Sequence, residues 1–202
     1  MPILPGNIAT ITTGFLDTVN DPGIMSLTAG DITERKKLGG RYEFSNDQAL
    51  RHSSTPSTAR LYGGIYQYVK ATGSLTRGQI VAWGTAANTG WTDFEVAAVT
   101  DAAGDARLAG IALGTVTSGQ YCFIQTTGLA WVVFRSSITN AAIGAGVYQL
   151  TTTATADAVA DATAVINLGA SGLMSYLGTA YTLPVNSSIT LVMLRGFTQN
   201  AG

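Results

Sequence analysis

Charged side chains are scarce in this sequence. Of its 202 residues, Asp, Glu, Lys and Arg make up 11%, and they nearly cancel to a net charge of −1, whereas an ordinary soluble domain carries about 25%. Nucleic-acid and anionic-membrane binders depend on clustered Lys and Arg, so neither kind of partner is expected. Residues 1–60 hold six basic and six acidic groups, which leaves five basic and six acidic groups for residues 61–202.

Cysteine and histidine are nearly absent too. Cys122 and His52 are the only residues of their kinds, which excludes an internal disulfide and any metal site built from several Cys and His. His52 has no partner at the spacing of a catalytic triad, and Cys122 alternates with aromatic residues as a small core residue does. The close acidic pairs match no calcium loop. We therefore assign no catalytic, cofactor-binding or metal-binding residue and do not expect an enzyme.

Long apolar runs are missing as well. The longest, at about residues 129–134, is far short of the roughly 20 residues that cross a bilayer as a helix. The first residues, Met1-Pro2-Ile3-Leu4-Pro5, lack the basic and then apolar regions of a signal peptide. A soluble chain without a membrane partner is expected.

The remaining composition is rich in Ala, Gly, Thr and Val, and it allows two interpretations. A body with so little charge can have part of its surface buried against partners, because solubility normally relies on charged groups. Alternatively, Thr and Ser hydroxyls solvate a monomeric sandwich. Composition does not choose between them.

Short β-branched or aromatic segments bounded by Gly, Ser, Thr or Asn recur along the chain and predict strands. Sustained helical periodicity is hard to find. The predicted class is all-β, with a body that is a small β-barrel or sandwich. The clearest strand segments are residues 79–83, 121–125, 129–134 and 188–193.

A shift of 68 positions aligns the sequence with itself. It superposes Gly78 on Gly146, Gly104 on Gly172, Gly110 on Gly178 and Gly128 on Gly196, and the segment 121–125 falls on 189–193. We interpret residues 74–129 and 142–197 as diverged copies of one unit. The copies form two small barrels or one larger sandwich, and the sequence leaves this open. The Ala-rich stretch 154–164 is predicted as a hairpin or loop rather than a helix, because it aligns with the turn signal Asn88-Thr89-Gly90.

The first 60 residues differ from the β-rich body, residues 61–202. They contain four of the five prolines and few strong strand runs, which is typical of an extended arm with a linker. Their apolar side chains are too many for a solvated tail. We expect this arm to lie in a groove on a partner.

Three short motifs in the first copy carry a family resemblance. They are Arg77-Gly78-Gln79-Ile80-Val81, then Leu108-Ala109-Gly110-Ile111-Ala112-Leu113, then Ser118-Gly119-Gln120-Tyr121 followed by Gly128. Together they resemble the small β-barrel module of bacteriophage head decoration, or cement, proteins over roughly residues 74–129. The second copy echoes the pattern weakly, and Pro184 and Asn186 depart from it.

The resemblance implies a structural protein of the virion, made in the host bacterial cytoplasm and bound to the outside of the phage head. There it would cement neighbouring subunits of the major capsid protein, as a homo-oligomer and most simply a trimer, with no cofactor. The sequence-based hypothesis gives capsid binding to the apolar and basic side chains of the arm, and self-association to uncharged faces of the body. The proposed capsid-binding residues are Ile8, Ile11, Phe15, Leu16, Arg35, Lys36 and Lys37.

A carbohydrate-binding β module of a tail spike or fibre is the alternative. Aromatic rings stack on sugar rings, and Trp91 is the best candidate because it follows a turn signal. Core or interface packing is the expected role of Trp83 and Trp131.

Overall fold

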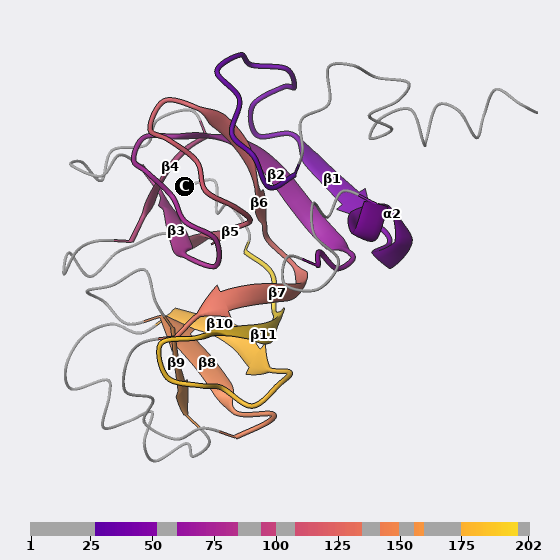
Figure 1. Cartoon of the computed structure of the whole chain (residues 1–202), viewed down its shortest axis with the longest axis vertical. Helices are drawn as coiled ribbons and strands as arrows, with labels where there is room; N and C mark the ends of the chain where they lie inside the picture. Colours follow the sequence, from indigo (N-terminus) through magenta and orange to yellow (C-terminus); the bar gives the residue numbers. More distant parts are fainter. Residues whose placement is uncertain are drawn as a thin grey trace, which may run out of the picture.

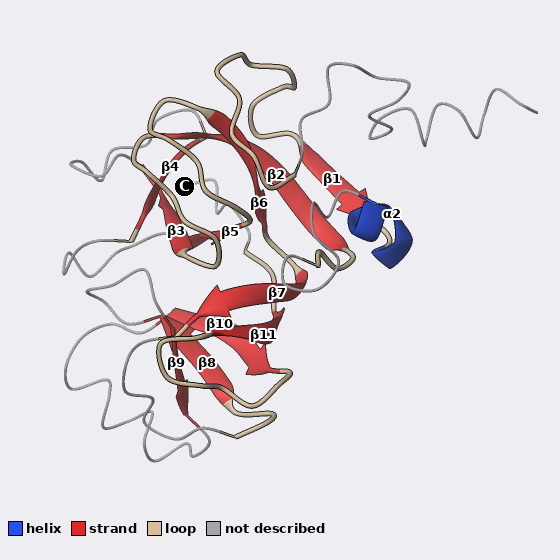
Figure 2. Cartoon of the chain, in the orientation of Figure 1, coloured by secondary structure: helices blue, strands red, loops and turns tan. Residues whose placement is uncertain are grey.

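Strands dominate the fold. The computed structural model describes residues 27–51, 60–84, 94–99, 108–134, 142–149, 156–159 and 175–197. In these ranges the chain forms eleven strands and one short helix (Figures 1 and 2). The predicted all-β class is confirmed.

Five strands close into a barrel. In chain order they are β2 (Gly64–Ala71), β3 (Ile80–Trp83), β4 (Glu95–Ala98), β5 (Leu108–Ala112) and β6 (Tyr121–Gln125). Because β2 pairs with both β4 and β6, the ring order β2-β4-β3-β5-β6 returns to its start. The β2–β4 pairing is parallel and the others in the ring are antiparallel. Alternate side chains point inward, so Val69, Val81 and Ile124 lie in the barrel core.

The other five strands of the body form a second, antiparallel sheet below the barrel in Figure 1. They are β7 (Gly128–Val133), β8 (Gly146–Gln149), β9 (Ala156–Val159), β10 (Ser175–Ala180) and β11 (Ile189–Leu194), in the order β7-β11-β10-β8-β9. One face of this sheet, including Val132, Leu177 and Val192, shares a core with Ile80 and Ile111 from the outer side of the barrel. The barrel thus covers the inner face of the second sheet.

The two sheets follow one pairing scheme. The order β2-β6-β5-β3-β4 in the barrel matches β7-β11-β10-β8-β9 in the second sheet. Both contain a bulge at the same place, where the β3–β5 and β8–β10 registers shift. Beside each bulge stands a glycine: a Cβ on Gly110 would lie 2.6 Å from the Gln125 carbonyl oxygen, and one on Gly178 would lie 1.9 Å from that of Met193. These glycines are required because the neighbouring strand leaves no room for a side chain.

The match differs from the sequence alignment in one detail. Gly144, rather than Gly146, occupies the place of Gly78, with φ of 81° and 82° respectively, a conformation that favours glycine. The Gly78 N–H donates to the Ala112 carbonyl and the Gly144 N–H to the Ala180 carbonyl, each at 2.8 Å. The common pairing scheme supports a duplication, which itself remains a prediction.

The local strand predictions agree with the structure. The four predicted segments coincide, within one or two residues, with β3, β6, β7 and β11. Within the Ala-rich stretch, β9 pairs with β8 in antiparallel fashion, as a hairpin requires.

Residues 27–51, which we call the N-terminal cover, are folded onto the barrel rather than extended as the sequence suggested. Within the cover, β1 (Arg41–Phe44) pairs with β2. The helix α2 (Asn46–Arg51) follows, and its start is stabilised by a capping box in which the Ser45 N–H donates to Gln48 Oε1 at 2.9 Å. The cover folds because its apolar side chains have a matching face to bury against. Its Leu27, Phe44 and Ala49 form a core cluster with Leu61 and with Tyr66, Tyr68, Leu113 and Phe123 of the barrel.

Candidate interaction surfaces

The basic cluster predicted to contact a capsid lies on a loop of the N-terminal cover. The Arg35 guanidinium forms an ion pair and hydrogen bond with Asp31, and the Arg35 backbone N–H donates to the Tyr68 hydroxyl at 3.1 Å. Asp31 also exchanges two backbone hydrogen bonds with Tyr121, at 2.9 and 2.8 Å. The loop is therefore anchored to β2 and β6, and the basic groups stand on a fixed surface.

The charges of this loop partly cancel. A backbone hydrogen bond from Thr33 and then the Arg35 side chain lower the pKa of Asp31 below its ordinary value. Asp31 and Glu34 stand against Arg35, Lys36 and Lys37, so the loop carries one net positive charge at neutral pH. Ile32 projects from the same loop with 83% of its surface exposed, which the sequence analysis did not single out. The loop offers a mixed apolar and charged contact surface.

The remaining predicted site residues lie outside the described part of the chain. These are Ile8, Ile11, Phe15 and Leu16 of the proposed capsid-binding arm, and Trp91 of the carbohydrate alternative. The roles assigned to them stay predictions.

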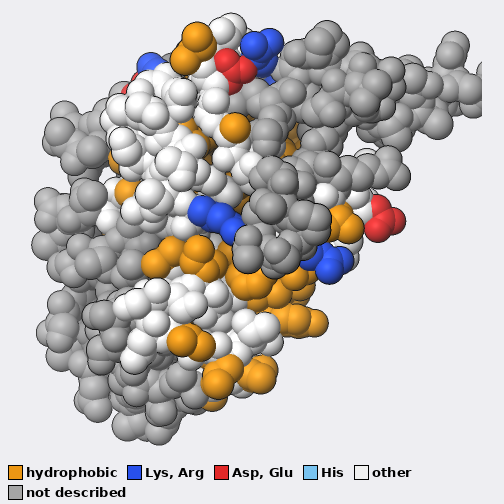
Figure 3. Space-filling model, in the orientation of Figure 1, with side chains coloured by type: hydrophobic (Ala, Val, Ile, Leu, Met, Phe, Trp, Pro, Cys, Tyr) orange, Lys and Arg blue, Asp and Glu red, His pale blue; other side chains and the backbone are white. Residues whose placement is uncertain are grey.

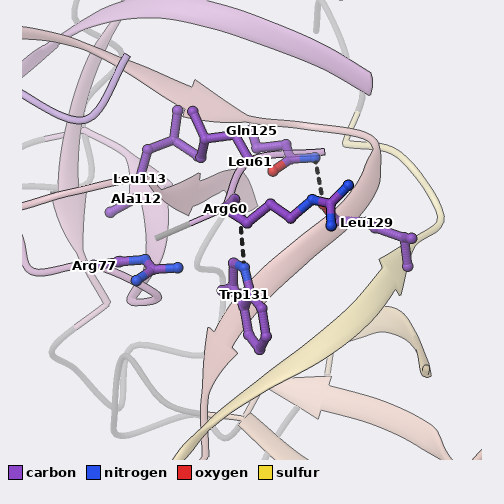
Figure 4. A pocket seen from close by; sticks show the side chains of 8 residues that line it. All are labelled: Arg60, Leu61, Arg77, Ala112, Leu113, Gln125, Leu129 and Trp131. Carbon is purple, nitrogen blue, oxygen red and sulfur yellow. Dashed lines mark hydrogen bonds between the residues drawn. The ribbon is translucent and has the colours of Figure 1, made fainter. Parts of the chain in front are cut away.

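A small hollow lies where the barrel meets the second sheet (Figure 4). The Arg77 guanidinium lies 5.8 Å from the centre of the Trp131 ring, and the Trp131 indole N–H donates to the Arg60 carbonyl at 2.7 Å. Burial lowers the pKa of Arg77, which nevertheless remains protonated at neutral pH. The hollow is just large enough to admit about one water molecule.

This geometry bears on the tryptophans. Trp131 is held by Arg60 and Arg77, and its ring lies 6.3 Å from that of Tyr62. Trp83 lies edge-on to Phe94, at 6.0 Å between ring centres, and packs against the barrel core. Both rings make contacts within the chain and are half-buried, and their expected role in core or interface packing stays a prediction.

Cys122 lies inside the barrel with 1% of its surface exposed. Burial raises the pKa of its thiol to about 12, so the thiolate does not form near neutral pH. The position agrees with the expected core role. Among the described residues no group of three or more His, Cys, Asp or Glu is placed to hold a metal ion, and no helix has the length and apolar character needed to cross a membrane.

An exposed apolar surface lies on β11 of the second sheet and on the connection that leads to it from β10. We call it the β11 face and define it by Tyr181, Leu183, Val185, Ile189 and Met193, which are exposed by 56, 55, 55, 37 and 42%. In Figure 3 hydrophobic side chains gather over the lower half of the molecule, where Figure 1 places the second sheet. The sequence carried a signal for this face: residues 189–194 are apolar at nearly every position, so both sides of the strand have apolar groups to bury.

Comparisons with known proteins add little. No protein-family model and no curated protein matches the chain. Among solved structures, one match is the N base of the head fibre gp8.5 of bacteriophage phi29. It covers 67% of this chain and 98% of its own, with 16% identity and a TM-score of 0.41. A similarity of this size carries no argument about function, so the proposals below rest on the chain itself.

Proposed function

We propose that this chain is a structural protein of a phage virion that binds the outside of the major capsid shell and cements neighbouring subunits, acting as a homo-oligomer and most simply as a trimer. The observation that carries the proposal is the placement of the three decoration-protein-like motifs. Although separated in sequence, they form one connected part of the barrel. Gly78 bonds to Ala112, Ile80 pairs with Ile111, and Ala112 pairs with Ile124, just beyond the turn at Gly119 and Gln120.

The mechanism would be mass action. A protein that binds the assembled shell, but not free capsid subunits, stabilises the shell by an amount that grows with the logarithm of its free concentration. Binding of this kind needs a rigid body and a contact surface that does not rearrange. The two packed β-sheets provide the rigid body. The anchored loop with Ile32, Arg35 and Lys37 is a candidate for the contact surface.

The fold indicates where a deletion that tests the proposed arm should end. Removing residues 1–50 would also strip the N-terminal cover from the barrel and expose Tyr66 and Tyr68. A deletion that stops at residue 26 keeps the cover. We expect this shorter variant to remain folded, with an unchanged circular dichroism spectrum and oligomeric state, and to lose most of its binding to purified phage heads in a co-sedimentation assay.

Point variants distinguish the effect of losing apolar side chains from the effect of shortening the chain. Ile8→Asp with Phe15→Asp should weaken head binding, because each places a charge in an apolar contact. Thr12→Asp with Thr18→Asp adds the same charges at polar positions of the same segment and serves as the control. Undiminished head binding by both the deletion and the Ile8/Phe15 variant would refute the arm hypothesis.

Cementing is tested separately from binding. Heads saturated with the protein should release their DNA at a higher temperature than bare heads, and the shift should increase with protein concentration. If the protein binds heads without changing this temperature, it decorates without cementing. The carbohydrate alternative depends on Trp91, and a change in tryptophan fluorescence on adding saccharides would favour it.

A further inference from the structure

The outer face of the barrel and the β11 face occupy matching positions in the common pairing scheme. Ala112 pairs with Ile124 in the barrel as Ala180 pairs with Val192 in the second sheet. Tyr181 therefore stands where the barrel has Leu113, and Met193 stands where it has Gln125. In the barrel these positions are 5% and 1% exposed, whereas Tyr181 and Met193 are 56% and 42% exposed.

At Leu113 the difference comes from the N-terminal cover, whereas Gln125 is held by hydrogen bonds from its side-chain amide to the Thr127 and Leu129 carbonyls. Leu27, Phe44 and Ala49 of the cover bury the outer face of the barrel. No described segment gives the five exposed side chains of the β11 face an equivalent cover, although Leu191, between Ile189 and Met193 on β11, is only 4% exposed. The chain's own N-terminal cover thus buries Leu113, whereas Tyr181 at the matching position of the second sheet is exposed.

The backbone at the two faces is adapted to these different situations. A Cβ on Gly114 would lie 1.7 Å from the Thr28 carbonyl oxygen, so the cover packs directly on the barrel backbone there. The matching residue of the second sheet is Thr182, whose hydroxyl accepts a hydrogen bond from the Leu191 N–H at 3.2 Å. The side chain of Thr182 occupies the space corresponding to that which the Thr28 backbone fills beside Gly114. A chain segment packed like the N-terminal cover therefore does not fit on the β11 face, and a different kind of partner is needed.

Charge and area indicate that occupant. Residues 175–194 contain no Asp, Glu, Lys or Arg, so two such faces would not repel each other. If a large apolar side chain presents about 200 Å² when fully exposed, the five residues of the β11 face present roughly 500 Å². Polar neighbours such as Thr179, which pairs with Met193, extend this area toward the roughly 800 Å² per partner of a stable interface.

A permanent contact fits this composition better than a transient one. A surface that must stay in water until it meets a capsid is normally about as polar as the rest of the protein, whereas a contact made between subunits of an oligomer is more apolar. A second copy of the chain is available as soon as the first is made. We propose that the β11 face is the contact between copies of this chain. The inference builds on the proposed function by assigning a surface to the proposed oligomer.

The test uses purified full-length protein without phage heads, so it does not depend on capsid binding. Val185→Lys combined with Met193→Lys places two charges in the face. We expect mass photometry to show the wild type as an oligomer and the double variant as a monomer, with the dissociation constant raised at least about tenfold for each lysine. Thr117→Lys is the matched control, because Thr117 is the exposed barrel residue at the position of Val185, and it should leave the oligomer intact.

A labelling experiment avoids any perturbation of folding. Since Cys122 is buried, Val185→Cys provides a single reactive thiol on the face, and Thr117→Cys provides the same thiol on the barrel. Labelling at 185 should slow as the protein concentration rises, while labelling at 117 should not. A monomeric wild type, an intact oligomer in the double lysine variant, or labelling at 185 that does not depend on concentration would each overturn the proposal. If the protein does not bind capsids but gives the expected results here, self-association through the β11 face is supported and the proposed function is refuted.

Discussion

Replacing Gly114 with alanine tests how the N-terminal cover is seated on the barrel. The new Cβ would lie 1.7 Å from the Thr28 carbonyl oxygen, 2.7 Å from its carbonyl carbon and 3.1 Å from its Cα. All three atoms belong to the backbone, so no side chain can rotate away. The start of the cover must move by more than an ångström, and the contact between Leu27 and the barrel loosens.

The cost follows from these contacts. Overpacking in a close-packed region costs about 1–3 kcal/mol, and full exposure of Leu27, which is 1% exposed in the native state, would cost about 1.5–3 kcal/mol. These are alternative routes to relieving one clash, so they do not add. The smaller conformational entropy of the unfolded alanine variant offsets about 0.4–1 kcal/mol. We expect Gly114→Ala to destabilise the protein by about 2 kcal/mol.

Two measurements check this prediction. Urea denaturation should show the lower stability, and hydrogen exchange should show faster exchange of the Asp31 amide, which donates to the Tyr121 carbonyl at 2.9 Å. Gly144→Ala is the control. That glycine also has a demanding backbone, with φ of +81°, but a Cβ there would have nothing within 4 Å, so the variant should lose about 1 kcal/mol without affecting Asp31. If Gly114→Ala is as stable as the wild type and protects Asp31 equally well, the cover is not seated as described.

Two further predictions concern titratable groups. Because burial raises the pKa of the Cys122 thiol to about 12, Ellman's reagent at pH 8 should react with one thiol per chain only after unfolding, and prompt reaction of the native protein would contradict its place in the barrel. The pKa of Asp31 is lowered from 3.8, so its contribution to stability is present above that pH and is lost as the pH falls through the lowered pKa. An NMR titration should place its midpoint below 3.8, and Arg35→Gln should raise the midpoint without restoring the ordinary value, because the hydrogen bond from Thr33 remains; a wild-type midpoint at 3.8 or above would contradict the loop geometry.

Local sequence patterns predicted the strands well, because a strand is specified by neighbouring residues. The alternation of residues 121–125 and the apolar run near residue 130 are sufficient to indicate β6 and β7. Repeated glycines were informative for a different reason, because they mark places where two strands come close together. Gly110 and Gly178 both lie beside a bulge, where the carbonyl of the adjacent strand excludes a Cβ.

The N-terminal region was harder to predict because its structure depends on distant partners. Phe44 is buried through contacts with Tyr66, whose ring lies 4.9 Å away edge-on, and β1 is held by β2, about twenty residues further along the chain. The prolines and weak strand signals of this region predicted an extended arm. Nothing in its own sequence indicates the apolar outer face of the barrel against which it packs. The capping box at Ser45 and Gln48 was the one local signal of the helix that went unused.

The sequence by itself determined the all-β class, the positions of the main strands, the buried role of Cys122 and the poverty of charge. Each of these depends on the chemistry or spacing of residues close together in the chain. Only the tertiary structure decided that one sheet closes into a barrel while its counterpart stays open, and that the N-terminal cover buries one apolar face and leaves the β11 face exposed. The physical reason is that burial depends on which surfaces meet in space. Leu113 and Tyr181, at matching positions of the two sheets, therefore have opposite exposure.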